Sequence, residues 1–190
     1  MAEPYDAVVL AGGTARRLGG VDKPALLVGD VSILDRVLAA VAGAARTVVV
    51  GPRRATAREV VWCREDPPGG GPVAALAAGL TEVTAELVVV LAGDLPFVSP
   101  DAVDLLLDAA SGQDGALLVD HDGREQLLAG AWRTDALRAA LPDQPAGARL
   151  GFVLLGLTPV RVGVHQLADA PPPWFDCDTD DDLAAARGMA

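Results

Sequence analysis

The chain has 190 residues, of which 51% are hydrophobic and 4% are aromatic, and its formal net charge at pH 7 is −11. This length and composition predict a single globular domain, residues 1–190, with a core of Ala, Val and Leu rather than aromatic rings. The negative charge argues against a nucleic-acid partner, because Lys and Arg are too few to neutralise phosphates along a duplex.

The first apolar run, residues 7–10, leads into a segment rich in glycine and positive charge. The run is short, continuous and followed by Gly12 and Gly13, which predicts a buried strand. Glycine lets the backbone take positive φ and approach a ligand closely, so that N–H groups can line an anion site. The cationic side chains of this segment are Arg16, Arg17 and Lys23. We therefore expect the segment to bind a polyphosphate.

The glycine spacing differs from that of the two familiar phosphate-binding loops. Lys23 is preceded by Asp22 and followed by Pro24, so there is no Gly-x-x-x-x-Gly-Lys-Ser/Thr motif. Gly12 and Gly13 are adjacent, which rules out Gly-x-Gly-x-x-Gly. A solvated surface turn is the alternative, but the length of the segment and the apolar strand before it argue against that interpretation.

Beyond this segment, short apolar runs alternate with helical patterns. The runs at 47–50, 60–63 and 87–91 predict further buried strands. The helices expected next to them are one capped by Ser32 and ending at Gly43, one with apolar side chains from Val73 to Leu80, and one opened by Ser99 and Pro100. This alternation indicates an α/β fold, a three-layer α/β/α sandwich with a mostly parallel, Rossmann-like sheet.

The predicted strand ends place several residues around one cleft, because ligands of open α/β sheets bind outside the carboxyl ends of the strands. The residues that follow the strands include Gly12, Gly51, Asp66 and Asp94. Asp94 comes directly after the strongest apolar run, and a carboxylate there suits Mg²⁺, which prefers oxygen ligands and bridges to phosphates. The alternative is that Asp94 only caps the turn before Pro96.

The second half of the chain is less regular. Residues 116–119 and 126–132 are expected to be strands that flank a turn at 120–124. The remaining expected elements are helices at 134–141 and 147–154, a short strand at 160–162, an extended segment at 174–178, and a last helix beginning near Thr179. Thr179 and Asp182 have the spacing of a capping box.

The cysteines and the N-terminus indicate the compartment. Cys63 and Cys177 are far apart and form no Cys-x-x-Cys motif, so we expect reduced thiols. The N-terminal residues lack the basic and apolar regions of a signal peptide, and no apolar run approaches the ~20 residues of a membrane helix. A cytoplasmic protein without a membrane partner is expected.

Taken together, the Leu10-Ala11-Gly12-Gly13 run, Arg16 and the Gly19-Gly20-x-Asp22-Lys23 run resemble the signature loop of the nucleotidyltransferases of the Rossmann-like, glycosyltransferase-A-like superfamily. Within that superfamily the chain most resembles the molybdenum cofactor guanylyltransferases. The resemblance implies transfer of GMP from GTP to the phosphate of molybdopterin cofactor, with Mg²⁺ as cofactor and release of pyrophosphate. It also implies transient contacts with proteins that deliver or receive the cofactor.

The resemblance extends to the candidate catalytic and metal-binding residues. The segment from Gly93 to Pro96 resembles the family's Asp-x-Pro motif, whose aspartate holds magnesium, so Asp94 is expected to bind the metal. Asp178 is the candidate second metal carboxylate and Asp176 its neighbour, where many relatives have Asn-x-Asn-Thr-Pro. The expected catalytic residues are Arg16, Lys23 and Asp94, because fixed cations and a metal stabilise the charge of a phosphoryl-transfer transition state.

The nucleotide-binding residues implied by the resemblance are Leu10, Ala11, Gly12, Gly13, Lys23, Gly51, Asp66 and Asp94. Asp66 and the glycines after it resemble the family segment that closes over guanine, where a carboxylate can accept hydrogen bonds from N1–H and the 2-amino group. Gly51 replaces an Asn found in many relatives, so only its main chain is available for contact. The Gly12-Gly13 pair favours guanine over cytosine.

The acceptor is expected near Arg124 and Gln126, which resemble a Gly-Arg-x-Gln segment, although an ordinary hairpin turn is the alternative. His121 and His165 have no partner at a useful spacing. Three other functions stay open: a related transferase acting with cytidine nucleotides, sugar phosphates or phospholactate; a non-catalytic nucleotide-binding module; and a dinucleotide-binding oxidoreductase.

Overall fold

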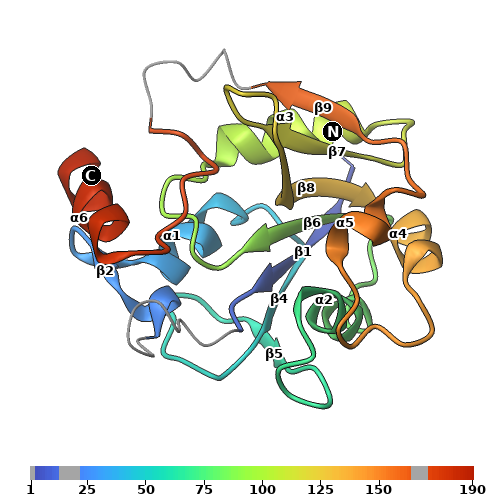
Figure 1. Ribbon diagram of the computed structural model, residues 1–190, viewed down its shortest axis with the longest axis horizontal. Coiled ribbons are helices and arrows are strands. Elements are labelled where there is room, and N and C mark those ends of the chain that lie inside the picture. Colours follow the sequence, from blue (N-terminus) through green and yellow to red (C-terminus); the bar gives the residue numbers. More distant parts are fainter. Residues whose placement is uncertain (1–2, 13–21, 164–170) are drawn as a thin grey trace.

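The computed structural model describes residues 3–12, 22–163 and 171–190 (Figure 1). In this part of the chain, a seven-stranded sheet has the strand order β5-β4-β1-β6-β8-β7-β9, and β2 and β3 form a separate two-stranded sheet. The strands are β1 (Tyr5–Leu10), β2 (Leu27–Val28), β3 (Val31–Ser32), β4 (Arg46–Val50), β5 (Val61–Cys63), β6 (Leu87–Ala92), β7 (Gly115–Val119), β8 (Glu125–Arg133) and β9 (Val160–Gly163).

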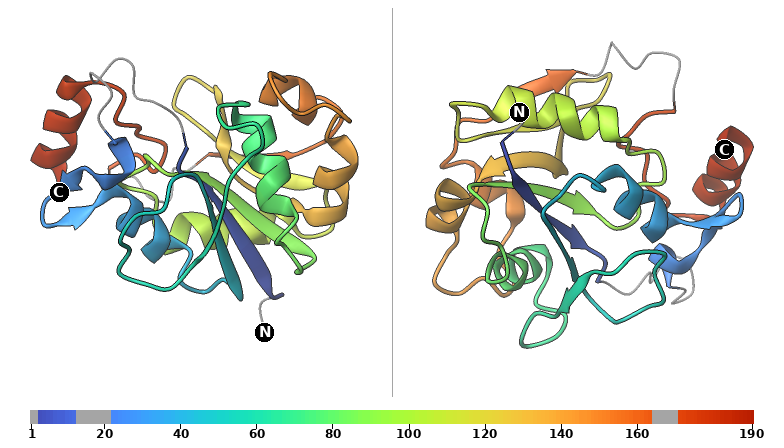
Figure 2. Two further views of the ribbon diagram at one scale, coloured as in Figure 1. Left: turned by 90° about the horizontal axis from the view of Figure 1, so that it is seen from below. Right: turned by 180° about the vertical axis from the view of Figure 1, so that it is seen from behind.

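Helices cover both faces of the large sheet, which gives the expected three layers (Figure 2). The helices are η2, a 3₁₀ turn (Lys23–Ala25), α1 (Ile33–Ala40), α2 (Pro72–Leu80), α3 (Pro100–Ala110), α4 (Thr134–Ala140), α5 (Leu150–Leu154) and α6 (Asp180–Met189). The apolar faces of α1 and α3 pack on one side of the sheet, and those of α2, α4 and α5 on the other. None of the helices in the described residues has the length and apolar character needed to span a membrane.

The strands at the centre of the sheet are continuous apolar runs because they are buried on both sides. Successive residues of β1 point to opposite faces, so that Val9 joins the core under α1 and α3, whereas Val8 joins the core under α2. The prediction that residues 7–10 and 87–91 form buried strands is confirmed.

Parallel pairing brings the carboxyl ends of four strands to one edge. β1 pairs in parallel with β4 and β6, with Leu10 opposite Val50 and Ala92. β4 also pairs in parallel with β5, and Val50 lies opposite Cys63. The loops that follow β1, β4, β5 and β6 therefore meet at this edge, as expected. On the other side, β8 runs antiparallel to β6 and β7.

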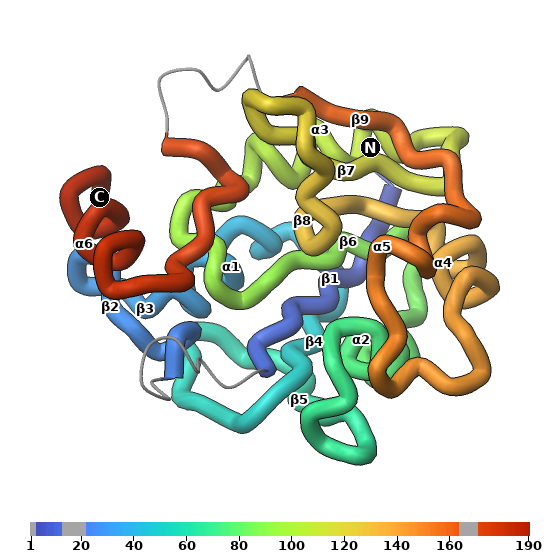
Figure 3. The backbone as a smooth tube through the Cα atoms, viewed as in Figure 1, coloured from blue at the N-terminus to red at the C-terminus, as the bar shows by residue number. Residues whose placement is uncertain are grey.

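The C-terminal segment crosses this edge and then leaves the large sheet (Figure 3). Residues 174–178, expected to be an extended segment, belong to no strand, and they lead into α6. Thr179 and Asp182 form the predicted capping box. Helix α6 contacts β2, and side chains from both regions share a small core whose buried residues are Val28, Ile33, Cys177, Leu183 and Ala186.

Some helix ends differ from the expectation. Helix α1 begins after the predicted Ser32 cap but ends at Ala40, before Gly43. Helix α5 begins at Leu150 rather than near residue 147. The serine cap of α3 is as predicted, because the Ser99 side chain accepts from the Ala102 N–H.

Candidate active site at the carboxyl edge of the sheet

A cavity of about 430 Å³ opens at the carboxyl ends of the parallel strands. We call it the first cavity. Four of the residues expected at the nucleotide line it: Leu10, Gly12, Gly51 and Asp94. The sequence expectation that these residues surround one cleft is thereby met for the described part of the chain.

Main-chain atoms of two strand ends form the floor of this cavity. The Ala11 N–H donates to the Val50 carbonyl at 2.9 Å, which holds the end of β1 against the end of β4. Gly51 has a φ of +147°, and a Cβ placed there would lie 2.7 Å from the Ala11 carbonyl oxygen. Only glycine fits such a close approach. Ala11 itself is buried, so it supports the floor, and Gly51 offers main-chain atoms alone.

Three residues that are distant in sequence converge beside Asp94. The Lys23 ammonium, carried by η2, is paired with the Asp178 carboxylate and lies 4.0 Å from Oδ2 of Asp94. Burial raises the pKa of the Asp94 carboxyl, as do the carboxylates of Asp176 and Asp178, whereas Lys23 lowers it. Among the described residues, the part-buried Lys23 ammonium thus lies beside several carboxylates at this point.

Lys23 is held in place by a contact that the sequence did not reveal. The Arg54 guanidinium donates to both carboxylate oxygens of Asp22, at 2.6 and 2.5 Å, and thus fixes the residue just before η2. A bidentate ion pair of this kind fixes the orientation of the two side chains as well as their position. No signal in the sequence linked Arg54 to Asp22, because 32 residues separate them.

The carboxylates of Asp94 and Asp178 fit a magnesium ion. Both lie close to the Lys23 ammonium, so the structure already accommodates positive charge between them. Mg²⁺ takes only one or two protein carboxylates and fills its other positions with water and substrate phosphate. No group of three or more His, Cys, Asp or Glu side chains suited to a metal occurs among the described residues. The donor set therefore suits an ion that arrives with a nucleotide better than a closed protein site.

The structure places Glu65, rather than Asp66, at the first cavity. Asp66 is exposed and does not line the cavity. The Glu65 side chain is 8% exposed and lines it. Its Oε1 accepts from the Gly69 N–H at 2.9 Å, while its buried Oε2 has no hydrogen-bond partner in the described structure. The carboxylate that lines this cavity is therefore Glu65 and not the expected Asp66.

A second cavity of about 300 Å³ adjoins the first. The two cavities share Ala92, Asp94 and Leu128. The second cavity is lined by Gln126, one of the two candidate acceptor residues, and by Asp176. Arg124, the other expected acceptor residue, is exposed and lines neither cavity.

Six residues of the sequence analysis lie outside the described residues: Gly13, Arg16, Arg17, Gly19, Gly20 and His165. His121 lies at the β7–β8 turn, where its ring packs edge-to-face on Trp174, with ring centroids 5.2 Å apart. Trp174 also lines the second cavity, and nothing in the sequence pattern singled it out.

Comparison with known proteins agrees with this geometry. Residues 7–154 match the MobA-like NTP transferase domain. The molybdenum cofactor guanylyltransferase of Mesorhizobium japonicum is 33% identical over 203 residues, covering 100% of this chain and 97% of that protein. The probable molybdenum cofactor guanylyltransferase of Methanosarcina mazei is 36% identical over 124 residues, which span 58% of this chain and 55%, about half, of that relative.

A solved structure has the same fold. Molybdopterin-guanine dinucleotide biosynthesis protein A from Archaeoglobus fulgidus superposes with a TM-score of 0.76 at 23% sequence identity, and 97% of each chain is covered. The domain match covers most of the chain, and the Mesorhizobium relative aligns over nearly its whole length. This chain therefore belongs to the MobA-like NTP transferase family.

Proposed function

We propose that this protein transfers GMP from GTP to the terminal phosphate of molybdopterin cofactor and releases pyrophosphate. The observation that carries the proposal is the meeting of two cavities at Asp94, with the Lys23 ammonium 4.0 Å from its carboxylate. A transferase needs two substrates side by side at one charged point. The names of the relatives supply the nucleotide and the acceptor.

The first cavity suits the nucleotide. Main-chain atoms of Gly12 and Gly51 line its floor, where a planar base can approach closely. The buried Oε2 of Glu65 is an acceptor without a partner among the described residues, and guanine offers two neighbouring donors, N1–H and the 2-amino group. Leaving that oxygen unpaired is costly, so a base with two adjacent donor groups, such as guanine, is favoured over cytosine or uracil, whose edges each carry one donor group.

The proposed transfer of GMP needs no strong general base in the protein. A phosphate monoester has a second pKa near ~6 and is mostly ionised at neutral pH, so the acceptor oxygen can attack without losing a proton to the protein. The new bond joins that oxygen to the α-phosphorus of GTP, and the bond from the α-phosphorus to the pyrophosphate oxygen breaks. No covalent intermediate with the protein is needed.

The protein holds and stabilises the reacting groups. Lys23, a short distance from Asp94, stabilises the charge that develops on the leaving pyrophosphate. Arg16 is expected to assist it, on the basis of the sequence resemblance. Asp94 and Asp178 would hold Mg²⁺, which supplies charge neutralisation on the triphosphate when bound. Positioning and electrostatics then account for most of the rate, as in other phosphoryl transfers.

The test is pyrophosphate release by the purified protein with molybdopterin and Mg²⁺, supplied in turn with GTP, CTP, ATP and UTP. We expect release with GTP and a guanylylated product. Release only with CTP, or only with a sugar phosphate or phospholactate as acceptor, would identify a related transferase instead. Nucleotide binding without any release would leave a non-catalytic module. A cytoplasmic location and contacts with cofactor-carrying proteins remain predictions.

A further inference from the structure

We propose that the second cavity binds a flat, fused heteroaromatic ring of the acceptor, with Trp174 as its stacking surface and Gln126 and Asp176 as hydrogen-bond acceptors for its N–H groups. This inference rests on the proposed function, since it assigns the acceptor's ring to one side of the same site. It concerns which class of acceptor the chain can hold.

The walls of the second cavity are apolar and aromatic. Leu95, Leu127 and Trp174 line it, together with the shared Leu128. Its volume of about 300 Å³ lies at the lower end of the ~300–1,000 Å³ range of small-molecule sites. An apolar and aromatic wall beside a few polar groups favours a planar ring that carries hydrogen-bonding groups at its edge.

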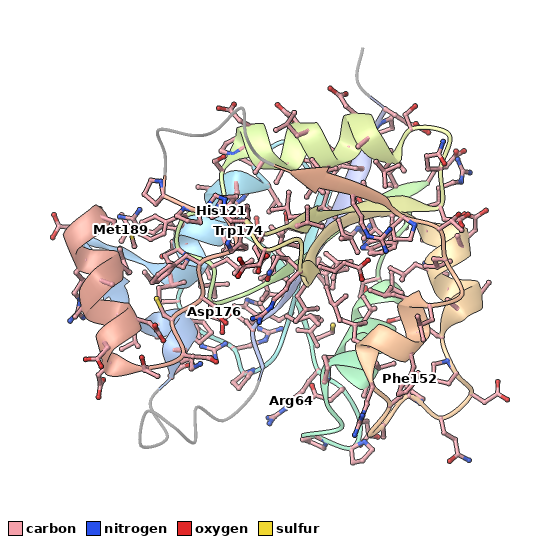
Figure 4. All side chains as sticks on the ribbon, turned by 45° about the horizontal axis from the view of Figure 1, so that its top comes forward. Arg64, His121, Phe152, Trp174, Asp176 and Met189 are labelled. Carbon is pink, nitrogen blue, oxygen red and sulfur yellow. The ribbon has the colours of Figure 1, made fainter. Side chains whose placement is uncertain are left out.

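The Trp174 indole packs against a second aromatic ring that is not part of the cavity lining. The His121 ring packs against the indole at a centroid distance of 5.2 Å and an interplanar angle of 78°. His121 does not line the cavity, whereas Trp174 does. Figure 4 shows the two side chains next to each other, with Asp176 from the same segment as Trp174. The indole is thus fixed before a ligand arrives, which lowers the entropy cost of stacking on it.

The polar groups of the cavity are acceptors. Nε2 of Gln126 donates to Oδ2 of Asp120 at 3.2 Å and to the Arg124 carbonyl at 3.5 Å. Its carbonyl oxygen is therefore the atom that it can offer to a ligand. The Asp176 carboxylate lines the same cavity. Two acceptors beside an aromatic face match a ring that carries adjacent amino and N–H donors, as a pterin does.

The position of Asp94 determines which end of the acceptor points towards the nucleotide. Asp94 belongs to both cavities and lies beside Lys23, where the phosphates react in the proposed function. An acceptor whose ring lies against Trp174 can extend its phosphate towards Asp94. The ring and the guanine base then occupy different cavities, and each can be tested without the other.

The test uses a simple probe, 6-hydroxymethylpterin phosphate, with binding measured by calorimetry and by quenching of tryptophan fluorescence. Trp174→Ala is expected to weaken probe binding at least about tenfold, the scale of one lost stacking contact. Trp174→Phe, which keeps an aromatic face, retains most of the affinity. Trp62→Phe, on β5 and outside the cavity lining, is the matched control and retains both affinity and quenching.

A second probe tests the acceptor groups. Lumazine phosphate has an oxygen where the pterin has its amino group, so we expect the wild type to prefer the pterin and Gln126→Leu to lose much of that preference. GTP affinity, measured separately, stays within about twofold in every variant. Three results would each overturn the inference. In Trp174→Ala, the affinities for GTP and for the probe could fall equally, or the affinity for the probe could stay unchanged. The wild type could also fail to bind the probe. Failure of the proposed function is a different result, namely no pyrophosphate release from GTP with any acceptor.

Discussion

Replacing Glu65 by Gln should change which base the protein prefers. Oε1 of Glu65 already accepts from the Gly69 N–H, and the amide oxygen of Gln can keep that bond. The substitution therefore exchanges the buried, unpartnered Oε2 for an NH₂ group, with almost no change in shape. That NH₂ group opposes the two donors of guanine but can donate to the 2-oxygen of xanthine.

The size of the change follows from the two hydrogen bonds at stake. Base-edge pairing of this kind discriminates by about 1–3 kcal/mol, which corresponds to roughly a 5- to 150-fold loss of GTP affinity. XTP affinity should rise over the same range. The free energy of unfolding should change little, because one buried polar group without a partner in the described structure is exchanged for another of the same shape, now uncharged.

The assay is calorimetric titration of the wild type and Glu65→Gln with GTP, ITP and XTP, alongside urea unfolding of both proteins. Asp66→Asn is the matched control, because it makes the same chemical change one residue away on an exposed side chain, and its nucleotide affinities should stay within about twofold. If GTP and XTP affinity changed equally in Glu65→Gln, or if Asp66→Asn caused the switch, our assignment of the base carboxylate would be wrong.

Three further predictions concern the charged cluster and its surroundings. Lys23→Ala should lower the rate of pyrophosphate release at least about 100-fold while the circular dichroism spectrum is retained, because the side chain supplies transition-state charge; near-normal turnover would remove it from the mechanism. Asp94→Asn should abolish the dependence of the rate on Mg²⁺ concentration, and an unchanged metal titration would contradict its role. Burial raises the pKa of Cys177 to about 11 from 9.0, and also raises the pKa values of Cys63 and Tyr5, so the folded state holds these protons more tightly. The free energy of unfolding should thus fall as the pH rises from about 9 towards 11, by less in Cys177→Ala; equal values at pH 8 and 10.5 would refute this.

The centre of the fold was predictable because its signal is local and strong. β1 and β6 are buried on both faces, so their sequences are continuous apolar runs that no surface segment shares. The capping residues Ser32, Ser99 and Thr179 were also found correctly, since each cap bonds to a backbone N–H only three residues on.

The site was predicted less completely, because its contacts depend on loops. Between Glu65 and Asp66 there is no periodicity to tell which carboxylate turns inward, and the resemblance pointed to Asp66, whereas Glu65 is the one that lines the first cavity. The extended pattern at 174–178 had no neighbouring strand to pair with, so the segment folds irregularly over the sheet edge. Trp174 gave no signal at all, since its role depends on His121 more than fifty residues earlier in the chain.

The small core under α6 links the far end of the chain to the reacting groups. Lys23 lies just before β2, and Asp178 lies just before α6, so both belong to the part of the molecule that packs around Val28 and Leu183. Asp94 instead follows a strand of the large sheet. The charged groups proposed for the reaction are thus supplied partly by the small core under α6 and partly by the large sheet, so the packing of the small core bears on how Lys23 and Asp178 lie beside Asp94. Substitutions in the last helix that loosen this core should therefore impair turnover, even at residues that line neither cavity.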